Sequence, residues 1–329
     1  MTRSFTHFFL VAALVILSFC CWTGKLLPGI LPVQTPSAAS QSTTVYDAVE
    51  TVTIQNNGPG KVTQIDLKVA MLRTILPYQE VLRTQVEPFD YQTISDEHGN
   101  VYASFILTNL NSGDSVEIKI SYQIKVNEVS YEINSCQGVL PSEYTYAETY
   151  IESDTAEIRQ TASSITQQQT DRCAQARDYY NYVIRNMRYT QYNPKDTGAL
   201  AALRSLRGDC TEFSDLLIAL SRAGGIPARM IDGLTCCTEN GYNEGQNKHN
   251  WVEIYLPNAG WVPMDPTWGR NPGKAEHYFG AMSADHIIVT QGRNLDTLNG
   301  YHYWAYRYWW DGDQPTLDAT ENWSILKSQ

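Results

Sequence analysis

Three residues of this chain carry side chains that together could perform nucleophilic catalysis: Cys210, His249 and Asp265. A cysteine thiolate attacks a carbonyl carbon, and a neighbouring histidine holds the proton and later delivers it to a leaving group. A carboxylate fixes the imidazole tautomer and stabilises its charged form. Each residue type is also common in packed interiors, so the segments around them must show whether the three side chains can meet.

Cys210 stands at the predicted start of an amphipathic helix. Four apolar residues after it recur at the spacing of one helix face: Phe213, Leu216, Leu217 and Leu220. Gly224 and Gly225 supply a helix C-cap, and Pro227 forbids continuation. The unpaired N–H groups and the positive end of the helix dipole favour a thiolate at this position. Gly208 would let the chain turn sharply and leave the sulfur in a cleft.

His249 and Asp265 lie on the two predicted strands of one β-hairpin. Residues 249–256 and 261–266 alternate between two faces and are joined by a turn. The loop length decides whether the two functional side chains share a face, because a shift of one residue moves a side chain to the other face. We predict a three-residue loop at 257–259.

This loop fixes the predicted pairing of the two strands. It places three pairs of residues opposite each other on the core-facing side: Leu256 with Gly260, Ile254 with Val262, and Val252 with Met264. The other face then carries Trp251 directly across from Asp265, with His249 one diagonal step away. An imidazole and a carboxylate can close that distance with a hydrogen bond, so the register predicts a His249–Asp265 pair.

The motifs around these residues occur in an order that resembles the transglutaminase-like superfamily. Four segments carry the resemblance: Gly208–Cys210 before a leucine-rich helix, Gly225–Arg229, His249–Glu253 and Gly260–Thr267. The resemblance runs from Tyr189 to Thr267, and two further segments, Asp285–Ile287 and Gly292–Asn294, are similar to exported bacterial members.

This resemblance implies an α+β protein with a papain-like, transglutaminase-like catalytic domain. It also implies a Cys-His-Asp triad at Cys210, His249 and Asp265. Most bacterial members are thought to be thiol proteases or amidases rather than cross-linking enzymes, so the same activity is implied for this chain.

An acyl-transfer site also needs hydrogen-bond donors for the oxyanion. The backbone N–H of Cys210 is one natural donor. Tyr189, Gln191 or Trp251 could offer a second donor or line the substrate site, and each of them could equally be a packing residue.

The sequence predicts no metal and no cofactor. No EF-hand loop pattern occurs, and no metal-ligand spacing connects three histidines of the C-terminal part: His277, His286 and His302.

The N-terminal residues indicate a targeting segment. Arg3 precedes an apolar run from Phe8 to Trp22, which is short for a transmembrane helix and typical of a signal peptide. Whether residues 1–22 are cleaved or kept as an anchor stays open, and a lipid-modified Cys20 is a weaker option because bulky Phe19 precedes it. Each outcome predicts an extracytoplasmic protein, secreted or anchored to the membrane.

Residues 23–44 are rich in Pro, Ser, Thr and Gln and are predicted to be a linker, followed by two domains. Residues 45–135 contain strands at roughly ten-residue spacing, typical of an all-β sandwich, and carry no recognisable catalytic motif. Residues 143–329 form the predicted catalytic domain. Its aromatic segment Tyr301–Trp310 alternates as a strand does, and we expect it to pack against the catalytic domain rather than form a sugar or peptide platform.

Composition narrows the compartment and the partners. The chain has 329 residues, of which 43% are apolar, and its net charge of −11 argues against nucleic acid or anionic membrane surfaces as partners. Five cysteines follow the targeting segment: Cys136, Cys173, Cys210, Cys236 and Cys237. An odd number in an oxidising compartment leaves one thiol free, which fits a reactive Cys210. The sequence leaves the pairing of the others open, including a bridge from Cys236 or Cys237 to Cys136 or Cys173.

Together these observations predict an exported thiol enzyme that cleaves or transfers an amide acyl group through a thioester on Cys210. The expected substrate is a protein, a peptide or a peptidoglycan peptide, with water or an amine as the acceptor. Membrane contact would run only through the N-terminal segment. The alternative is a non-catalytic cell-surface binding module that keeps the fold and uses the β-sandwich and the aromatic segment for contacts.

Overall fold

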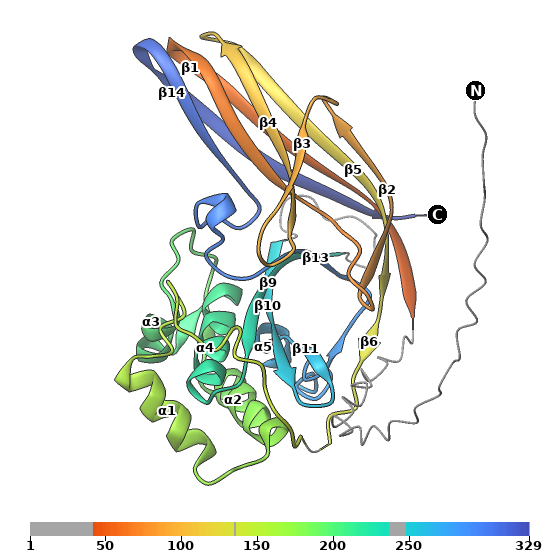
Figure 1. Cartoon of the computed structure of the whole chain (residues 1–329), viewed down its shortest axis with the longest axis vertical. Coiled ribbons are helices and arrows are strands. Elements are labelled where there is room, and N and C mark those ends of the chain that lie inside the picture. Colours follow the sequence, from red (N-terminus) through yellow and green to blue (C-terminus); the bar gives the residue numbers. More distant parts are fainter. Residues whose placement is uncertain (1–41, 135, 237–247, 329) are drawn as a thin grey trace, which may run out of the picture. The chain divides into compact units, whose positions relative to one another are not determined.

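The computed structural model describes residues 42–134, 136–236 and 248–328 (Figure 1). The predicted targeting segment, nearly all of the predicted linker, and Cys237 lie outside these ranges. Within the same ranges, no helix has both the length and the apolar character that a membrane crossing requires.

The N-terminal region forms a six-stranded antiparallel sheet in the order β2-β5-β1-β4-β3, with β14 also pairing with β1. Its strands are β1 (Thr43–Met71), β2 (Gln79–Glu87), β3 (Gln92–Ser95), β4 (Val101–Leu110), β5 (Ser115–Asn127) and β14 (Trp304–Lys327). The sequence predicted strands within β1, β4 and β5, but it also predicted a turn at 56–60 that would divide β1, which instead runs on as one strand. It gave no prediction for β2 or β3.

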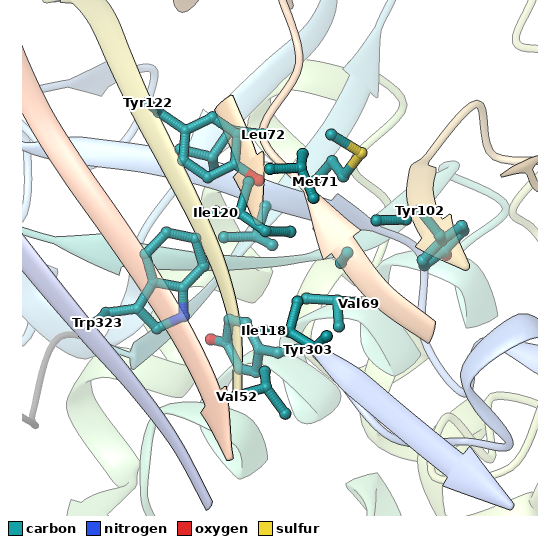
Figure 2. Packing of buried hydrophobic residues seen from close by; sticks show 14 of the residues in the cluster. Val52, Val69, Met71, Leu72, Tyr102, Ile118, Ile120, Tyr122, Tyr303 and Trp323 are labelled. Atoms are coloured by element: carbon teal, nitrogen blue, oxygen red, sulfur yellow. The ribbon is translucent and has the colours of Figure 1, made fainter. Parts of the chain in front are cut away.

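Strand β1 is long because both of its halves find a partner. Residues 43–55 pair with β5 and residues 62–71 pair with β4, while β14 follows both halves. The register shifts between Asn56 and Lys61, within the segment where the sequence predicted a turn. Buried side chains from both halves pack in one cluster, as Figure 2 shows for Val52, Val69 and their neighbours. In that cluster Trp323 stacks on Tyr122 with ring centroids 6.2 Å apart.

The aromatic C-terminal segment is a strand, as predicted, but its partner is not the predicted one. Strand β14 pairs along its length with β1, beside which it lies in Figure 1, so it completes the N-terminal sheet. Alternate rings stack in a row: Trp304, Tyr306, Tyr308 and Trp310. The expectation that this segment packs against the catalytic domain holds only at its start, where His302 and Tyr303 contact Asp232 and Gly233, and is wrong from Trp304 onward. Alternation predicts a strand but does not say which sheet it joins.

The region that contains the predicted catalytic residues combines a second sheet with helices. Its four strands have the antiparallel order β11-β10-β9-β13 and are β9 (Ala228–Thr235), β10 (Lys248–Leu256), β11 (Gly260–Met264) and β13 (His286–Gln291). The helices are α1 (Ala156–Thr166), α2 (Arg172–Asn186), α3 (Ala199–Ser205), α4 (Cys210–Ala223), α5 (Pro266–Gly269) and a 3₁₀ turn η1 (Asp296–Leu298). Two small ladders, β6 (Val129–Ser130) with β12 (Ala281–Met282) and β7 (Arg188–Tyr189) with β8 (Arg207–Gly208), complete the region.

The catalytic sheet is buried on both faces. Val252 and Ile254 of β10 pack with α2 and α4 in one apolar cluster, whereas Trp251 packs with Ile231 and Ile288 in another. Adjacent residues of β10 therefore point into two different interiors. Trp251 fits on its side because Gly233 of β9 has no side chain: a Cβ there would lie 2.2 Å from the indole ring.

The predicted register of the β10–β11 hairpin is confirmed. Leu256 pairs with Gly260, Ile254 with Val262, and Val252 with Met264, around the three-residue loop. One detail differs: β11 ends at Met264, so Asp265 lies just beyond the strand and caps α5 instead of pairing with Trp251. Pro266, which cannot donate a backbone hydrogen bond, explains why the ladder stops there.

One disulfide joins Cys136 to Cys173, with the Cα atoms 5.2 Å apart. It ties the segment before α1 to the first turn of α2. Among the described residues Cys210 is the free cysteine, which agrees with the predicted leftover thiol. The two cysteines are 37 residues apart with α1 between them, so no local pattern in the sequence shows that they meet.

Candidate active site

Cys210 is the first residue of α4, as predicted, and its side chain is partly exposed. Asp209 caps the helix: its carboxylate accepts the backbone N–H of Thr211 at 2.9 Å. Glu212 reciprocates by accepting the backbone N–H of Asp209 at 3.0 Å, which completes a capping box. The start of α4, and with it the sulfur, is held in one backbone geometry.

Gly208 serves this cap in a way that the sequence did not predict. A Cβ at Gly208 would lie 2.3 Å from the Cβ of Glu212, so only glycine lets the Glu212 side chain fold back on the cap. The cap also holds the neighbouring loop, because Asn193 donates its N–H to Asp209 at 3.0 Å and Thr197 donates its hydroxyl to Glu212 at 3.0 Å.

His249 and Asp265 form the predicted pair. His249 Nε2 lies 2.8 Å from Asp265 Oδ2, and both side chains are buried. The other oxygen, Oδ1, accepts the backbone N–H groups of Thr267 and Trp268 at 2.8 and 2.9 Å. The carboxylate is thus aimed by the start of α5. The indole of Trp268 stacks on the imidazole with centroids 5.3 Å apart, which fixes the ring plane.

The surroundings of His249 favour its protonated form. Burial by itself lowers the pKa of the imidazole, but the Asp265 carboxylate and the contact with Cys210 outweigh it and raise the pKa to about 10. Burial would raise the pKa of Asp265, yet His249 and His286 hold it well below its usual range. Because Nε2 is bonded to Asp265, Nδ1 is the ring nitrogen left for the sulfur.

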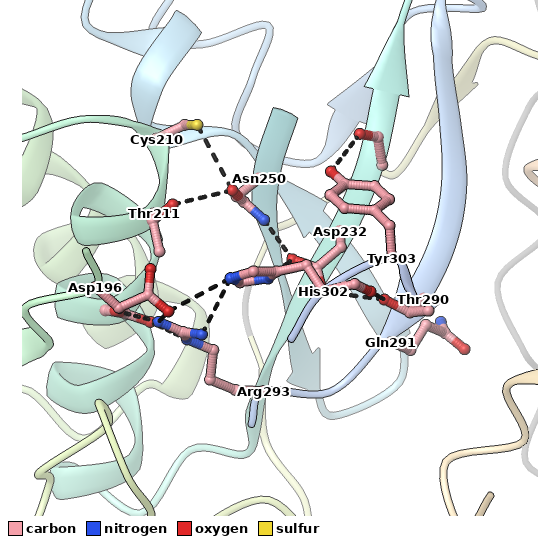
Figure 3. Close-up of polar contacts among 12 residues, drawn as sticks. Asp196, Cys210, Thr211, Asp232, Asn250, Thr290, Gln291, Arg293, His302 and Tyr303 are labelled. Carbon is pink, nitrogen blue, oxygen red and sulfur yellow. Dashed lines mark hydrogen bonds and ion pairs between the residues drawn. The ribbon is translucent and has the colours of Figure 1, made fainter. Parts of the chain in front are cut away.

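A second polar group approaches Cys210 from the other face of β10. Asn250 Oδ1 lies 3.6 Å from Cys210 Sγ and accepts the hydroxyl of Thr211 at 3.1 Å (Figure 3). The amide nitrogen of Asn250 donates to Asp232 of β9, its partner in the ladder. Two neighbours therefore fix the orientation of the amide, with its oxygen toward the sulfur.

Asp232 continues this contact into a buried network that Figure 3 follows from Asn250 to Arg293. It accepts the hydroxyl of Thr290 at 3.0 Å and lies 2.9 Å from His302 Nδ1. Burial lowers the pKa of His302, but Asp232 and Asp196 outweigh it and raise the pKa to about 10. Beyond His302, Arg293 binds Asp196 and Asp215, the latter from α4, at 3.0 Å each.

The three further candidates lie in different surroundings. Tyr189 is 43% exposed, and the guanidinium of Arg270 lies over its ring at 4.8 Å. Burial and the charge of Cys210 raise the pKa of its hydroxyl. Gln191 is exposed on the loop after β7. Trp251 is only 1% exposed and packs edge-to-face against His286, which is the packing alternative for this residue.

Three buried residues could each supply one metal-ligand atom, and these atoms lie within 4.8 Å of one another: His249, Asp265 and His286. This is the group of described residues whose spacing comes nearest to a metal site. The His249–Asp265 contact at its centre is an ordinary proton-carrying hydrogen bond, which a metal ion would have to replace. We therefore treat the group as a hydrogen-bonded cluster.

Sequence reasoning missed several residues around the site. Asp209 was read only as part of a motif, and the side-chain roles of Asn250, Asp232 and Trp268 were not predicted. The signal for Asn250 was its place beside His249 on a strand with two buried faces. His286 and Arg293 stood in segments that carried the family resemblance, but without a position in space they had no role.

The fold and the site together have a papain-like α+β architecture, with a cysteine at a helix start, a histidine on a neighbouring hairpin and an aspartate at the end of that hairpin. Residues 159–266 match the family model of the transglutaminase-like superfamily. The chain therefore contains a domain of this superfamily, which includes cysteine proteases and transglutaminases. The matched residues include Cys210, His249 and Asp265.

A solved structure supports the fold beyond this domain. A candidate cysteine protease from Cytophaga hutchinsonii aligns with a TM-score of 0.59 and 14% sequence identity, over 89% of this chain and 100% of that chain. At this identity the likeness concerns the fold. The periplasmic domain of TgpA from Pseudomonas aeruginosa aligns over 71% of this chain and 91% of that chain, with 15% identity and a TM-score of 0.32.

Curated relatives match shorter stretches. The uncharacterized protein YebA of Bacillus subtilis is 28% identical over 179 residues, which is 47% of this chain and 24% of YebA. A protein-glutamine gamma-glutamyltransferase of Pseudomonas aeruginosa is 29% identical over 82 residues, which is 21% of this chain and 11% of that protein. The matched stretches thus span about a quarter or less of these two relatives.

Proposed function

We propose that this protein is an exported thiol enzyme that acts on an amide through a thioester on Cys210, as a protease or amidase. The observation that carries the proposal is the buried His249–Asp265 hydrogen bond of 2.8 Å, beside a cysteine at the start of α4. A buried imidazole that favours its protonated form is suited to stabilise a thiolate next to it.

The proposed reaction has two acyl-transfer steps. His249 Nδ1 takes the thiol proton of Cys210 before the reaction, which gives a thiolate–imidazolium pair. The thiolate then attacks the amide carbon, and the tetrahedral oxyanion is bound by the Cys210 backbone N–H. The Tyr189 hydroxyl, whose pKa is raised by burial and by the charge of Cys210, is the proposed second donor. When the C–N bond breaks, His249 gives its proton to the leaving amine, and the acyl group stays on sulfur as a thioester.

The acceptor decides the product. Water, deprotonated by His249, attacks the thioester and releases a carboxylic acid, and the proton returns to the sulfur. An amine in place of water would give a new amide, which is the outcome for a transferase. The proposed substrates are amides of proteins, peptides or peptidoglycan peptides, and the N-terminal segment would be the contact with the membrane.

Thiol labelling tests the proposed pair. At about pH 6 an ordinary thiol is almost fully protonated, so only an activated cysteine reacts quickly with iodoacetamide. We expect the wild type to react at least about ten times faster than His249→Ala, and Cys210→Ala to show no labelling at this site. His277→Ala is the matched control, because that histidine bonds Ser283 instead. Equal alkylation rates for the wild type and His249→Ala would contradict the proposal that His249 activates Cys210.

Product analysis then separates hydrolysis from transfer. The protein is incubated with peptidoglycan peptides or protein amides in ¹⁸O-labelled water, with and without an added primary amine. A hydrolase incorporates ¹⁸O into the new carboxyl group, and a transferase yields the amine adduct in the mass spectrum. If Cys210 shows neither activated labelling nor turnover, the alternative of a non-catalytic binding module replaces the enzyme.

A further inference from the structure

His286, the first residue of β13, lies at the centre of an aromatic enclosure behind the catalytic pair. Its ring meets Trp268 and Trp251 edge-on, with centroids 4.7 and 5.2 Å away, and Tyr278 lies at 6.1 Å. The residue is 2% exposed. Packing of this kind fixes the ring in one orientation, so the direction in which each ring nitrogen points is determined by the fold.

The two ring nitrogens of His286 face two different carboxylates. Nδ1 lies 2.7 Å from Asp285 Oδ1, and Nε2 lies 3.6 Å from Asp265 Oδ2. The same atom, Asp265 Oδ2, also binds His249 Nε2 at 2.8 Å. Within the described residues Nε2 of His286 has no hydrogen-bond partner. A buried polar atom without a partner is rare and is expected to have a reason.

The arrangement is a row of four ionisable groups in the order Asp285, His286, Asp265 and His249. When both histidines are protonated, anion and cation alternate along the row. Burial lowers the pKa of His286, but Asp265 and Asp285 outweigh it, and the pKa is raised. The His286 contact in turn lowers the pKa of Asp265. A cation on this side of Asp265 weakens the hold of the carboxylate on the proton of His249.

We propose that His286 is a positioning residue that shares the Asp265 carboxylate with His249 and thereby limits the basicity of the catalytic imidazole. This inference rests on the proposed function. The benefit is kinetic: an imidazolium that Asp265 holds too firmly would give up its proton reluctantly to the leaving amine. Asp285 acts through His286, by accepting its Nδ1–H and favouring its charged form.

Other titratable groups also face this row. Those near its aspartates are Tyr46, Tyr180 and Tyr278, and Cys210 lies at its His249 end. The pKa of each of the three tyrosines is raised, so the phenols stay neutral over the neutral pH range. The wild type and the His286 variants therefore differ only in the charge of the His286 imidazole, and not in the charge of these tyrosines.

The test is the pH profile of iodoacetamide alkylation at Cys210, combined with ¹⁵N shifts of the histidine ring nitrogens. His286→Gln removes the cation, so we expect the alkaline limb of the profile and the titration of His249 to move to higher pH by about one unit. His277→Gln, the control, should leave both where they are in the wild type. An unchanged alkaline limb in a folded His286→Gln protein would overturn the proposal.

A second variant keeps the proposal testable if His286→Gln does not fold. The Asp285 side chain is 34% exposed, so Asp285→Asn changes no buried packing. We expect a smaller shift in the same direction, and no additional shift when Asp285→Asn is combined with His286→Gln. A full additional shift would contradict action through His286. If the wild type lacks any dependence on His249, the proposed function fails, and this inference with it. If the wild-type profile depends on His249 but neither variant shifts its alkaline limb, this inference is wrong and the proposed function is unaffected.

Discussion

His249 and Asn250 are neighbours on β10, yet each begins a different buried polar cluster. From His249 a row runs through Asp265 and His286 to Asp285, enclosed by aromatic rings. From Asn250 a branched network runs through Asp232 and His302 to Asp196, Arg293 and Asp215. In both clusters a histidine lies between two aspartates. The alternation of side chains along one strand puts the two clusters on opposite faces of the sheet.

The two clusters differ in how completely their members are bonded. The Asn250 network holds a guanidinium against two carboxylates, and both oxygens of Asp232 accept hydrogen bonds. The His249 row contains a ring nitrogen, Nε2 of His286, whose 3.6 Å contact with Asp265 is too long for a hydrogen bond, and an oxygen that two imidazoles approach. A fully bonded network adds rigidity and stability, whereas the row ends at His249, which contacts Cys210. The comparison predicts that one cluster governs the reaction rate and the other governs stability.

The largest expected effect is on the reaction rate, from Asp265→Asn. This change keeps the shape but removes the charge that stabilises protonated His249, and related triads lose about 10⁴-fold in rate on such a change. We expect a loss of about 10³- to 10⁴-fold in the rate of amide turnover, measured at pH 7 on protein shown to be folded by circular dichroism. A loss of less than about tenfold would contradict a working triad.

The next effect is on stability, from Asp232→Asn in the other cluster. The substitution removes one of the two carboxylates that hold the buried, charged His302, and it weakens the acceptor that Asn250 had. We expect the free energy of unfolding in urea to fall by about 2 to 4 kcal/mol. The alkylation rate of Cys210 in the folded protein should stay within about tenfold of the wild type.

Asp318→Asn on the exposed side of β14 is the matched control for that substitution, and its unfolding free energy should stay close to that of the wild type. If Asp232→Asn slowed alkylation as strongly as Asp265→Asn while leaving stability intact, the division of roles between the two clusters would be wrong.

Local patterns in the sequence were enough to predict the His249–Asp265 pair of one cluster, but not its His286 and Asp285 and no contact of the other cluster. Helix periodicity placed Cys210, and strand alternation with loop length placed His249 and Asp265, because each of these rules acts over a few residues. The Asn250 network joins α4, β9, β10, β13 and the segment before β14. No periodicity relates residues so distant in the chain, and each of them has an ordinary surface role as its default interpretation.

The placement of β14 failed for a related reason. Its alternation was visible in the sequence, but the choice between two sheets depends on which edge is unpaired once both sheets have formed. Strand β1 is paired with β4 and β5 on one side only, so its other side accepts the C-terminal strand. That choice is a property of the assembled fold and could not be read from Tyr301–Trp310.

The last effect concerns a carboxyl group that belongs to neither cluster. Glu50 of β1 is 1% exposed, and neither of its oxygens has a hydrogen-bond partner among the described residues. Burial and the nearby Glu321 raise the pKa of Glu50 well above 4.5, its ordinary value. The folded protein thus keeps a proton that the unfolded chain releases above about pH 4.5, so stability falls as the pH rises from there toward the folded-state pKa.

Glu50→Gln removes this dependence, because an amide carries no charge at any pH in that range. We expect the free energy of unfolding of the variant to rise relative to that of the wild type as the pH increases above 4.5. The gain is up to about 1.4 kcal/mol for each pH unit between 4.5 and the folded-state pKa of Glu50. Glu117→Gln on the exposed face of β5 is the control and should follow the wild-type profile. Melting curves that stay parallel for Glu50→Gln and the wild type from pH 4 to 8 would mean that Glu50 finds a partner in solution. Glu50 would then be a partnered buried charge, like the aspartates of the two clusters.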